Sequence, residues 1–91
     1  MQFEWDDRKA ERNLRLHGVS FEEAVTVFDD ALFLTFPDAD HSYEEQRYII
    51  MGESNKGRLL VVAYAARESV TRLISAREAT RKERRSYEED I

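Results

Sequence analysis

The sequence predicts an α+β fold in which one twisted antiparallel sheet carries two N-terminal helices and one C-terminal helix. Helix-capping residues recur in residues 6–24, apolar β-branched runs separated by turn residues fill the middle, and residues 76–88 are rich in Arg and Glu. Helices at both ends of a set of strands joined by short hairpins are typical of one sheet with helices packed on it. The predicted order is β-α-α-β-β-β-β-α, and residues 1–91 are expected to form a single domain.

A short N-terminal strand is followed by two helices that meet at a tight corner. Asp6 is a good N-cap for the first helix, and Gly18 occupies the position of a left-handed residue at its end. Ser20-Phe-Glu-Glu23 is a capping box, in which Ser20 binds the amide of Glu23 and the Glu23 carboxylate reaches back to Ser20. The two helices are expected over residues 6–17 and 20–28.

Four more strands are expected between the helices. The segment 31–36 is apolar enough for a buried strand, which Pro37 would end, and residues 38–45 read as a polar loop. The run 58–64 is apolar on both alternating faces, which favours a central strand covered on two sides. The turn residues Asn55 and Gly57 precede it. The expected strands span residues 31–36, 46–51, 58–64 and 70–74.

The last helix is expected to begin at Ser75, because Ser75-Ala-Arg-Glu78 repeats the capping-box pattern, and to extend to about residue 88. Its apolar stripe contains only small residues and Tyr87, so it has little to hold it against a core. We therefore expect it to pack loosely or to be completed by a partner, either another protein or a second copy of the chain.

Composition excludes several classes of protein. The chain has no cysteine, which excludes disulfides and thiolate metal sites. No apolar run approaches the roughly 18 residues of a membrane-spanning helix, and the N-terminus lacks a basic-then-apolar signal pattern. We expect a cytoplasmic protein with no membrane partner.

The charge is unevenly distributed along the chain. A net charge of −5 argues at first against a nucleic-acid partner. However, residues 1–46 hold 12 acidic and 4 basic side chains, a net charge of −8, whereas residues 67–85 hold 7 basic and 3 acidic ones, a net charge of +4. The basic part could bind phosphate, although Arg- and Glu-rich helices are often only solvated.

Four aromatic residues near the N-terminus are expected in the core. Phe3, Trp5, Phe21 and Phe28 flank the capping positions, so they would anchor the helical corner to the sheet. We do not expect them to form a platform for stacking bases.

Two separated blocks of sequence together resemble a known family. The first block holds an aromatic pair, regularly spaced polar residues and a capping box: Phe3, Trp5, Asp6, Lys9, Asn13 and His17-Gly-Val-Ser-Phe-Glu-Glu-Ala24. The second holds two strand segments and part of the last helix: Gly57-Arg-Leu-Leu-Val-Val62, Arg72-Leu-Ile-Ser-Ala-Arg77, Glu83-Arg84 and Tyr87. In order and spacing, over nearly the whole chain, these blocks resemble the BrnT toxins of bacterial type II toxin–antitoxin pairs.

The resemblance implies a small RelE-like ribonuclease fold and an RNA-cleaving activity that halts growth. It also implies neutralisation by a DNA-binding antitoxin called BrnA. The implied partners are therefore RNA and a BrnA-type antitoxin, with DNA contacted only indirectly through the antitoxin.

The residues themselves support metal-free cleavage of RNA. This reaction needs a base for the 2′-hydroxyl, cations to neutralise developing negative charge, and an acid for the leaving oxygen. His17, beside a patterned helical face, is the candidate proton carrier, and Arg72 and Arg77 could hold one phosphate between a strand and the first turn of the last helix. The predicted catalytic residues are thus His17, Arg72 and Arg77, with no metal and no cofactor. Asp29 and Asp30 read as helix-stop residues rather than ligands.

Four further residues are predicted to bind RNA: Lys9, Arg58, Arg81 and Tyr87. Lys9 shares a helical face with His17, Arg58 opens the predicted central strand, and Arg81 continues a stripe of arginines on the last helix. Tyr87 could stack on a base.

Each of these residues also has a structural interpretation. Arg72 could pair with a carboxylate such as Glu45, His17 could serve at its helix end, and Tyr87 could be a core ring. The arginines of the last helix could pair with acidic neighbours four residues away. The alternative function is accordingly a non-catalytic interaction module that modulates a DNA-binding partner, and carboxylate pairing of both Arg72 and Arg77 would favour it.

Overall fold

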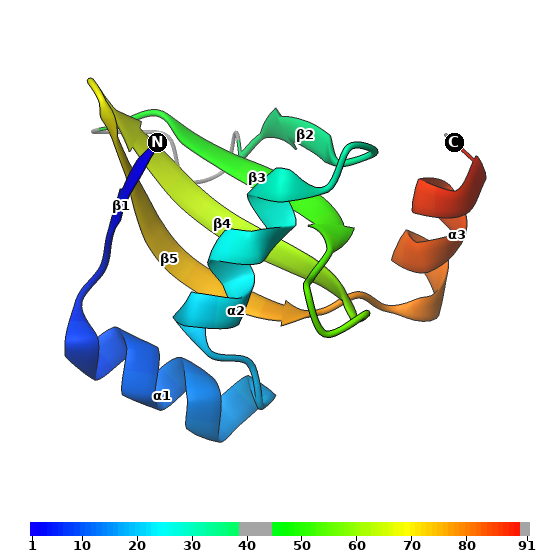
Figure 1. The fold of residues 1–91 in the computed structure, drawn as a ribbon, viewed down its shortest axis with the longest axis horizontal. Coiled ribbons are helices and arrows are strands. Elements are labelled where there is room, and N and C mark those ends of the chain that lie inside the picture. The colour runs from blue at the N-terminus through cyan, green and yellow to red at the C-terminus, as the bar shows by residue number, and fades with distance from the viewer. Residues whose placement is uncertain (39–44, 90–91) are drawn as a thin grey trace.

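The computed structural model describes residues 1–38 and 45–89. It contains a five-stranded sheet, with helices on one side of the sheet and beside one of its ends (Figure 1). The observed element order confirms the predicted one. The elements are β1 (Gln2–Glu4), α1 (Asp7–His17), α2 (Phe21–Val25), the 3-10 turn η1 (Thr26–Asp29), β2 (Leu34–Pro37), β3 (Arg47–Glu53), β4 (Leu59–Arg67), β5 (Val70–Glu78) and α3 (Arg81–Glu89). Most of the predicted loop 38–45 lies outside the described residues.

The sheet is mixed rather than wholly antiparallel. Its strand order is β1-β5-β4-β3-β2, and β2 to β5 pair antiparallel, as predicted. However, β1 pairs parallel to β5, with Gln2 opposite Val70. A parallel pair requires a long crossover, and here everything from α1 to β4 lies between the two strands. The α+β class is confirmed, while the expectation of a purely antiparallel sheet was wrong for the first strand.

The caps of α1 and α2 largely follow the prediction. The Asp6 carboxylate accepts hydrogen bonds from the amides of Arg8 and Lys9, and Gly18 has a φ of 68°. The Ser20 hydroxyl accepts from the amide of Glu23 at 3.0 Å. The other half of the predicted capping box is not formed, because the Glu23 carboxylate turns inward and binds Arg58 and Ser54.

The core lies between the sheet and the helices α1 and α2. Its fully buried side chains are Val19, Phe21, Ala24, Val27, Ile50, Leu60, Val62, Leu73 and Ala76. The predicted aromatic anchors belong to this core: Phe21 is buried, and Phe3, Trp5 and Phe28 pack against it with edge-to-face ring contacts. The helical corner is therefore fixed to the sheet by these rings.

The second strand differs from its prediction in bounds and in burial. β2 spans Leu34–Pro37 and forms an outer edge of the sheet, so Phe36 is 46% exposed. The prediction of a buried strand over residues 31–36 was therefore wrong, because an apolar run can also form an exposed strand at the edge of a sheet. Pro37 is the last residue of the strand, which an edge position tolerates because no neighbouring strand needs its missing amide.

The last strand and helix also differ from the prediction. Residues 75–78 continue β5, where Ala76 lies opposite Val62 on β4, so the expected helix start at Ser75 was wrong. The actual capping box is formed by Thr80 and Glu83. The amide of Glu83 donates to the Thr80 hydroxyl at 3.1 Å, and the amide of Thr80 donates to the Glu83 carboxylate at 2.8 Å.

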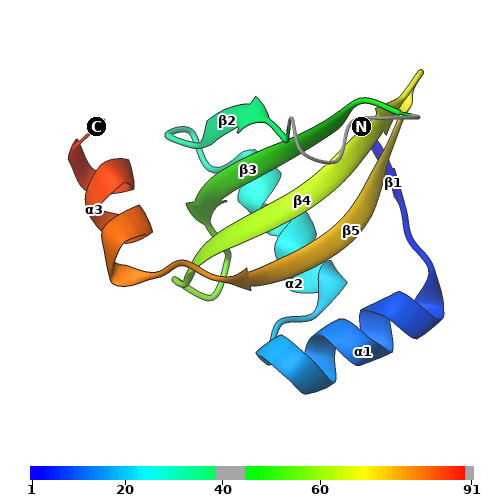
Figure 2. The same cartoon turned by 180° about the vertical axis from the view of Figure 1, so that it is seen from behind.

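Helix α3 is attached to the rest of the protein by few side chains. Tyr87 is the only buried residue of the helix over its described length, and it covers a second small apolar cluster that contains Met51, Leu59 and Val61. Both views place α3 beside the end of the sheet and away from α1 (Figure 2). None of the described helices is long and apolar enough to cross a bilayer.

Candidate functional site

Two of the predicted site residues lie together in a groove between α1 and the outer edge of β5. We call this groove, of about 230 Å³, the α1–β5 groove; it is lined by Lys9, Arg12, Asn13, Leu16, His17, Ile74 and Ser75. Lys9, Asn13 and His17 are four residues apart along α1, so their shared face follows from helical periodicity. The predicted association of Lys9 with His17 on one face is thus confirmed.

The groove exists because β5 has no neighbouring strand along its second half. β1 pairs with β5 only as far as Arg72, and α1 lies beside the rest of this edge (Figure 1). The buried Asn13 side chain takes the place of a strand there. Its Nδ2 donates to the carbonyl oxygens of Ala76 at 2.8 Å and Val19 at 2.9 Å, and its Oδ1 accepts from the amide of Ala76 at 3.0 Å. Asn13 thereby fixes the distance between α1 and β5.

A β-bulge shapes the strand side of the groove. Ala63 lies opposite Ser75 and Tyr64 lies opposite Leu73, which leaves Ile74 without a partner on β4. In a regular strand, residues 73 and 76 would point to opposite faces, yet Leu73 and Ala76 both belong to the core. The bulge therefore re-aims Ile74 and Ser75 toward the groove.

The groove carries positive charge that no carboxylate neutralises within the described part of the chain. Neither Lys9 nor Arg12 forms an ion pair there, and His17 is the only histidine among the described residues. Asp6, the N-cap of the same helix, is an acidic residue whose charge interacts with that of Lys9 without forming an ion pair. The pKa of Asp6 is lowered by the amide hydrogen bonds of Arg8 and Lys9 and then by the charge of Lys9. The groove is therefore suited to an anion.

Arg72 lies next to β1 and is paired. Its guanidinium forms a short ion pair with Glu4, the residue opposite it in the parallel β1–β5 pair. Because the following residue, Leu73, points into the core, Arg72 points to the other face of the sheet. A phosphate at Arg72 would have to compete with Glu4.

Arg77 lies at the end of β5 rather than in the first turn of α3, and it too is paired. Its two terminal nitrogens donate to the two carboxylate oxygens of Glu83 at 2.8 and 2.9 Å. This fork, with the amide of Thr80, lowers the pKa of Glu83 to about 2 and raises the pKa of Arg77. The contact ties the start of α3 to the strand before it.

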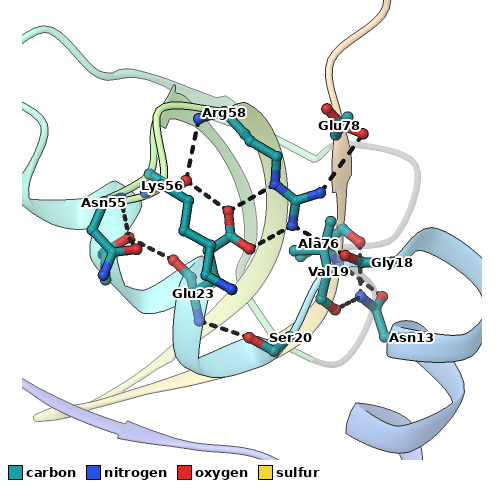
Figure 3. A network of polar contacts seen from close by, with 12 residues as sticks. Asn13, Gly18, Val19, Ser20, Glu23, Asn55, Lys56, Arg58, Ala76 and Glu78 are labelled. Carbon is teal, nitrogen blue, oxygen red and sulfur yellow. Dashed lines mark hydrogen bonds and ion pairs between the residues drawn. The ribbon is translucent and has the colours of Figure 1, made fainter.

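Arg58 is the centre of a polar network that joins three parts of the chain (Figure 3). Its Nε donates to the carboxylate of Glu23 at 3.0 Å, and one Nη donates to the carbonyl oxygen of Gly18 at 3.0 Å. Ser54 also donates to Glu23, at 2.7 Å, and Glu78 lies 3.8 Å from the guanidinium. The hydrogen bond from Arg58 lowers the pKa of Glu23, although burial opposes this. Arg58 therefore supports the end of α1 next to His17.

Tyr87 and Arg81 lie on α3, away from the α1–β5 groove. The Tyr87 ring is buried and its hydroxyl donates to Asp30 at 2.6 Å; burial and then this hydrogen bond raise its pKa to about 12. Arg81 is exposed and, with Arg84, Arg85 and acidic residues of the last turn, lines a hollow along α3. Of the alternative pairs between arginines and acidic neighbours four residues away, Arg84–Glu88 and Arg85–Glu89 are not formed in the structure as described.

Sequence reasoning gave no site role to the other lining residues of the groove, three of which are polar. Arg12 is three residues after Lys9, so helical spacing could have placed it on the same face. Ser75 was assigned to a helix cap, and Asn13, although its spacing places it on the same helical face as Lys9 and His17, was given no role. No group of three or more His, Asp or Glu side chains suited to a metal ion occurs in residues 1–38 and 45–89.

Comparison with known proteins assigns the chain to a family. A family model described as "Ribonuclease toxin, BrnT, of type II toxin-antitoxin system" matches residues 5–83. The crystal structure of the Brucella abortus ribonuclease toxin BrnT has the same fold, with a TM-score of 0.69 and 24% sequence identity over 89% of this chain and 99% of that one. No curated protein sequence matches the chain significantly. Since the family model covers most of the sequence, this chain belongs to the BrnT family of type II toxin–antitoxin ribonuclease toxins.

Proposed function

We propose that this chain is a metal-independent endoribonuclease that arrests growth by cleaving cytoplasmic RNA and is neutralised by a BrnA-type antitoxin. Family membership supports a ribonuclease toxin in general. The observation that carries the finer proposal is the α1–β5 groove, where His17 and two unpaired cations lie together. A type II antitoxin and RNA are then the proposed partners, and DNA would be contacted only through the antitoxin.

The proposed reaction is an internal displacement at phosphorus. His17 removes the proton of a ribose 2′-hydroxyl, the 2′-oxygen bonds to phosphorus, and the bond from phosphorus to the 5′-oxygen breaks. The products are a 2′,3′-cyclic phosphate and a 5′-hydroxyl, whose proton comes from the imidazolium or water. Lys9 lies on the same face of α1 and is proposed to bind a neighbouring phosphate of the RNA, which holds the strand in place beside His17.

Arg72 and Arg77 are proposed to hold RNA after exchanging their carboxylate partners for phosphate. Both pairs are partly solvated, since the side chains of Glu4 and Arg77 are 40% and 43% exposed, and such pairs contribute only about 0–1 kcal/mol. A phosphate can accept the same two-pronged hydrogen bonds that Glu83 now accepts from Arg77. Arg81, on the unpaired stripe of α3, is proposed as an outer RNA contact.

Arg58 and Tyr87 enter the proposed RNA site differently. Arg58 adjoins Gly18 and so borders the His17 end of the groove, where its remaining exposed surface could contact RNA. Tyr87 could contact RNA only if α3 moved, because its ring is buried and its hydroxyl is bound to Asp30.

A second candidate function is favoured by one observation. Arg72 and Arg77 are both paired with carboxylates, as expected for a non-catalytic module that binds a DNA-binding partner. Such a module would need no free proton carrier. The unpaired cations beside His17 are the reason we prefer the enzyme.

The catalytic proposal is tested with purified protein, single-stranded RNA and EDTA. We expect cleavage in EDTA and 2′,3′-cyclic phosphate ends, and we expect His17→Gln to lower the rate by about 10²–10⁴-fold. Because the His17 side chain is exposed, the midpoint of urea unfolding should be the same for the His17→Gln variant and the wild type. Arg15→Gln, an exposed position outside the groove, is the control. Intact RNA with folded wild-type protein would favour the second candidate.

The partner is tested in bacteria. Expression of the chain alone should arrest growth, and co-expression of a BrnA-type protein encoded beside it should restore growth. Arrest that the His17→Gln variant still causes would contradict His17-dependent RNA cleavage as the source of toxicity.

A further inference from the structure

We propose that Arg12 and Lys9 form a phosphate-binding subsite for single-stranded RNA in the α1–β5 groove, one nucleotide step away from the phosphate that His17 acts on. The RNA ligand rests on the proposed function, but the subsite makes a claim about binding alone. The subsite adds three residues to the proposed RNA site. Arg12 and Ser75 contact RNA, and Asn13 positions Arg12 and Ser75.

The charge balance of the β5 edge singles out this groove. The arginines beside it are each committed to a carboxylate: Arg58 to Glu23, Arg72 to Glu4 and Arg77 to Glu83. Arg12 has no such partner among the described residues. The chain has a net charge of −5, so carboxylates are in excess, and yet these neighbouring cations form no ion pair among the described residues. An anionic ligand would give them a function.

The spacing of the cations fits more than one phosphate. Lys9 and Arg12 are one helical turn apart, so their side chains can reach the same group. His17 is five residues beyond Arg12, and the three residues together span about 12 Å along α1 at 1.5 Å per residue. One phosphate cannot contact both ends of that span. A strand with successive phosphates can, with one on the Lys9–Arg12 pair and the next at His17 and Ser75.

The size and walls of the groove favour a segment of a polymer over a free small molecule. Its volume of about 230 Å³ is below the roughly 300–1,000 Å³ of pockets that enclose a whole small ligand. Its apolar lining residues are Leu16, which is 69% exposed, and Ile74. These side chains suit contact with a ribose or a base edge, while the Ser75 hydroxyl adds a hydrogen-bond donor.

Asn13 makes the subsite rigid before RNA arrives. Its three hydrogen bonds hold α1 against β5 at the middle of the groove, between Arg12 and His17. A site that is already in place loses less conformational freedom on binding, which strengthens affinity. Asn13 is therefore a positioning residue and needs no contact with RNA.

The test measures binding without cleavage. A fluorescein-labelled single-stranded oligonucleotide of 2′-O-methyl RNA has no free 2′-hydroxyl, so affinity can be followed by anisotropy over a series of salt concentrations. For Arg12→Gln we expect at least fivefold weaker binding and a salt slope reduced by about 0.7, the loss of one phosphate contact. For Arg15→Gln, which removes the same charge from the same helix outside the groove, we expect the slope of the wild type.

The outcomes separate the subsite from the proposed function. Equal effects of Arg12→Gln and Arg15→Gln, or no binding by folded wild-type protein, would overturn the subsite. A wild type that binds in an Arg12-dependent way but never cuts unmodified RNA would support the subsite and contradict the nuclease. A polyglutamate peptide bound as tightly, with the same dependence on Arg12, would assign the groove to an acidic protein and overturn the RNA proposal.

Discussion

The basic residues of the sheet and those of α1 differ in whether a carboxylate is paired with them. On the sheet, Arg58, Arg72 and Arg77 are each held by a carboxylate, whereas Lys9 and Arg12 on α1 face a groove with no such partner in the described chain. Charge counted along the sequence suggests the opposite, because the first half of the chain is acidic and the last part basic. The number of cations in a segment is thus a poor guide to where an anion can bind.

The geometry of α1 explains the difference. The acidic residues Asp7 and Glu11 line a separate hollow between α1 and α2, on another side of the helix from the groove. An acidic helix can therefore present a basic face, because residues three and four apart share a side. The basic strand β5 has no such separation, since its arginines lie within reach of carboxylates on β1 and α3.

The largest expected effect comes from removing a paired arginine. Arg58→Ala should lower the free energy of unfolding by about 3 kcal/mol at pH 7, because it leaves the Glu23 carboxylate buried without its cation; the Glu23 side chain is only 1% exposed. The pKa of Glu23 is lowered in the fold, so the contribution of the pair is present above the ordinary pKa and lost as the pH falls. Urea denaturation at pH 7 measures the change.

The matched control for Arg58 is Arg67→Ala. Arg67 also pairs with a glutamate, Glu45, but its side chain is 50% exposed, so we expect a change of only about 0–0.5 kcal/mol. If Arg58→Ala lost no more stability than the small change expected for Arg67→Ala, the Arg58 network would not be a structural support.

The second-largest expected effect comes from changing Asn13, the residue that joins α1 to β5. Asn13→Ala should cost about 2–3 kcal/mol of unfolding free energy, because the buried amide and carbonyl groups of Ala76 lose their partner. It should also weaken RNA binding although no charge changes. Asn55→Ala, which alters only an exposed contact to Thr26, should leave both unfolding and binding nearly unchanged. Unaltered RNA affinity in a folded Asn13→Ala variant would remove its positioning role.

Features set by neighbouring residues could be predicted from the sequence. The caps at Asp6 and Gly18, the hydroxyl half of the Ser20 box and the central position of β4 all follow from local pattern, and all are observed. The shared face of Lys9 and His17 follows from helical periodicity alone.

Features set by distant residues could not. Ser75 to Glu78 carries a helix-start pattern, but pairing with β4 extends the strand through it. Glu23 is drawn from its own cap by Arg58, 35 residues away, and Asn13 binds Ala76 across 63 residues. Which carboxylate pairs with each arginine depends on the register of β1 and the position of α3, and neither can be predicted from the neighbouring residues. The unpaired groove could be recognised only once those pairs were known.

Apart from the controls, the smallest expected effect concerns the partly exposed pair of Arg77 and Glu83. Arg77→Gln should lower the free energy of unfolding by about 0.5–1 kcal/mol at pH 7, because the fork to Glu83 is partly solvated. The folded pKa of Glu83, about 2, lies below its ordinary value of 4.5, so the contribution of the pair is complete above pH 4.5 and declines toward pH 2. Urea denaturation of both proteins between pH 7 and pH 3 should therefore give curves that converge as the pH falls. A difference that stayed constant would mean that Arg77 stabilises α3 by packing rather than by charge, and a phosphate could then bind Arg77 without loosening that helix.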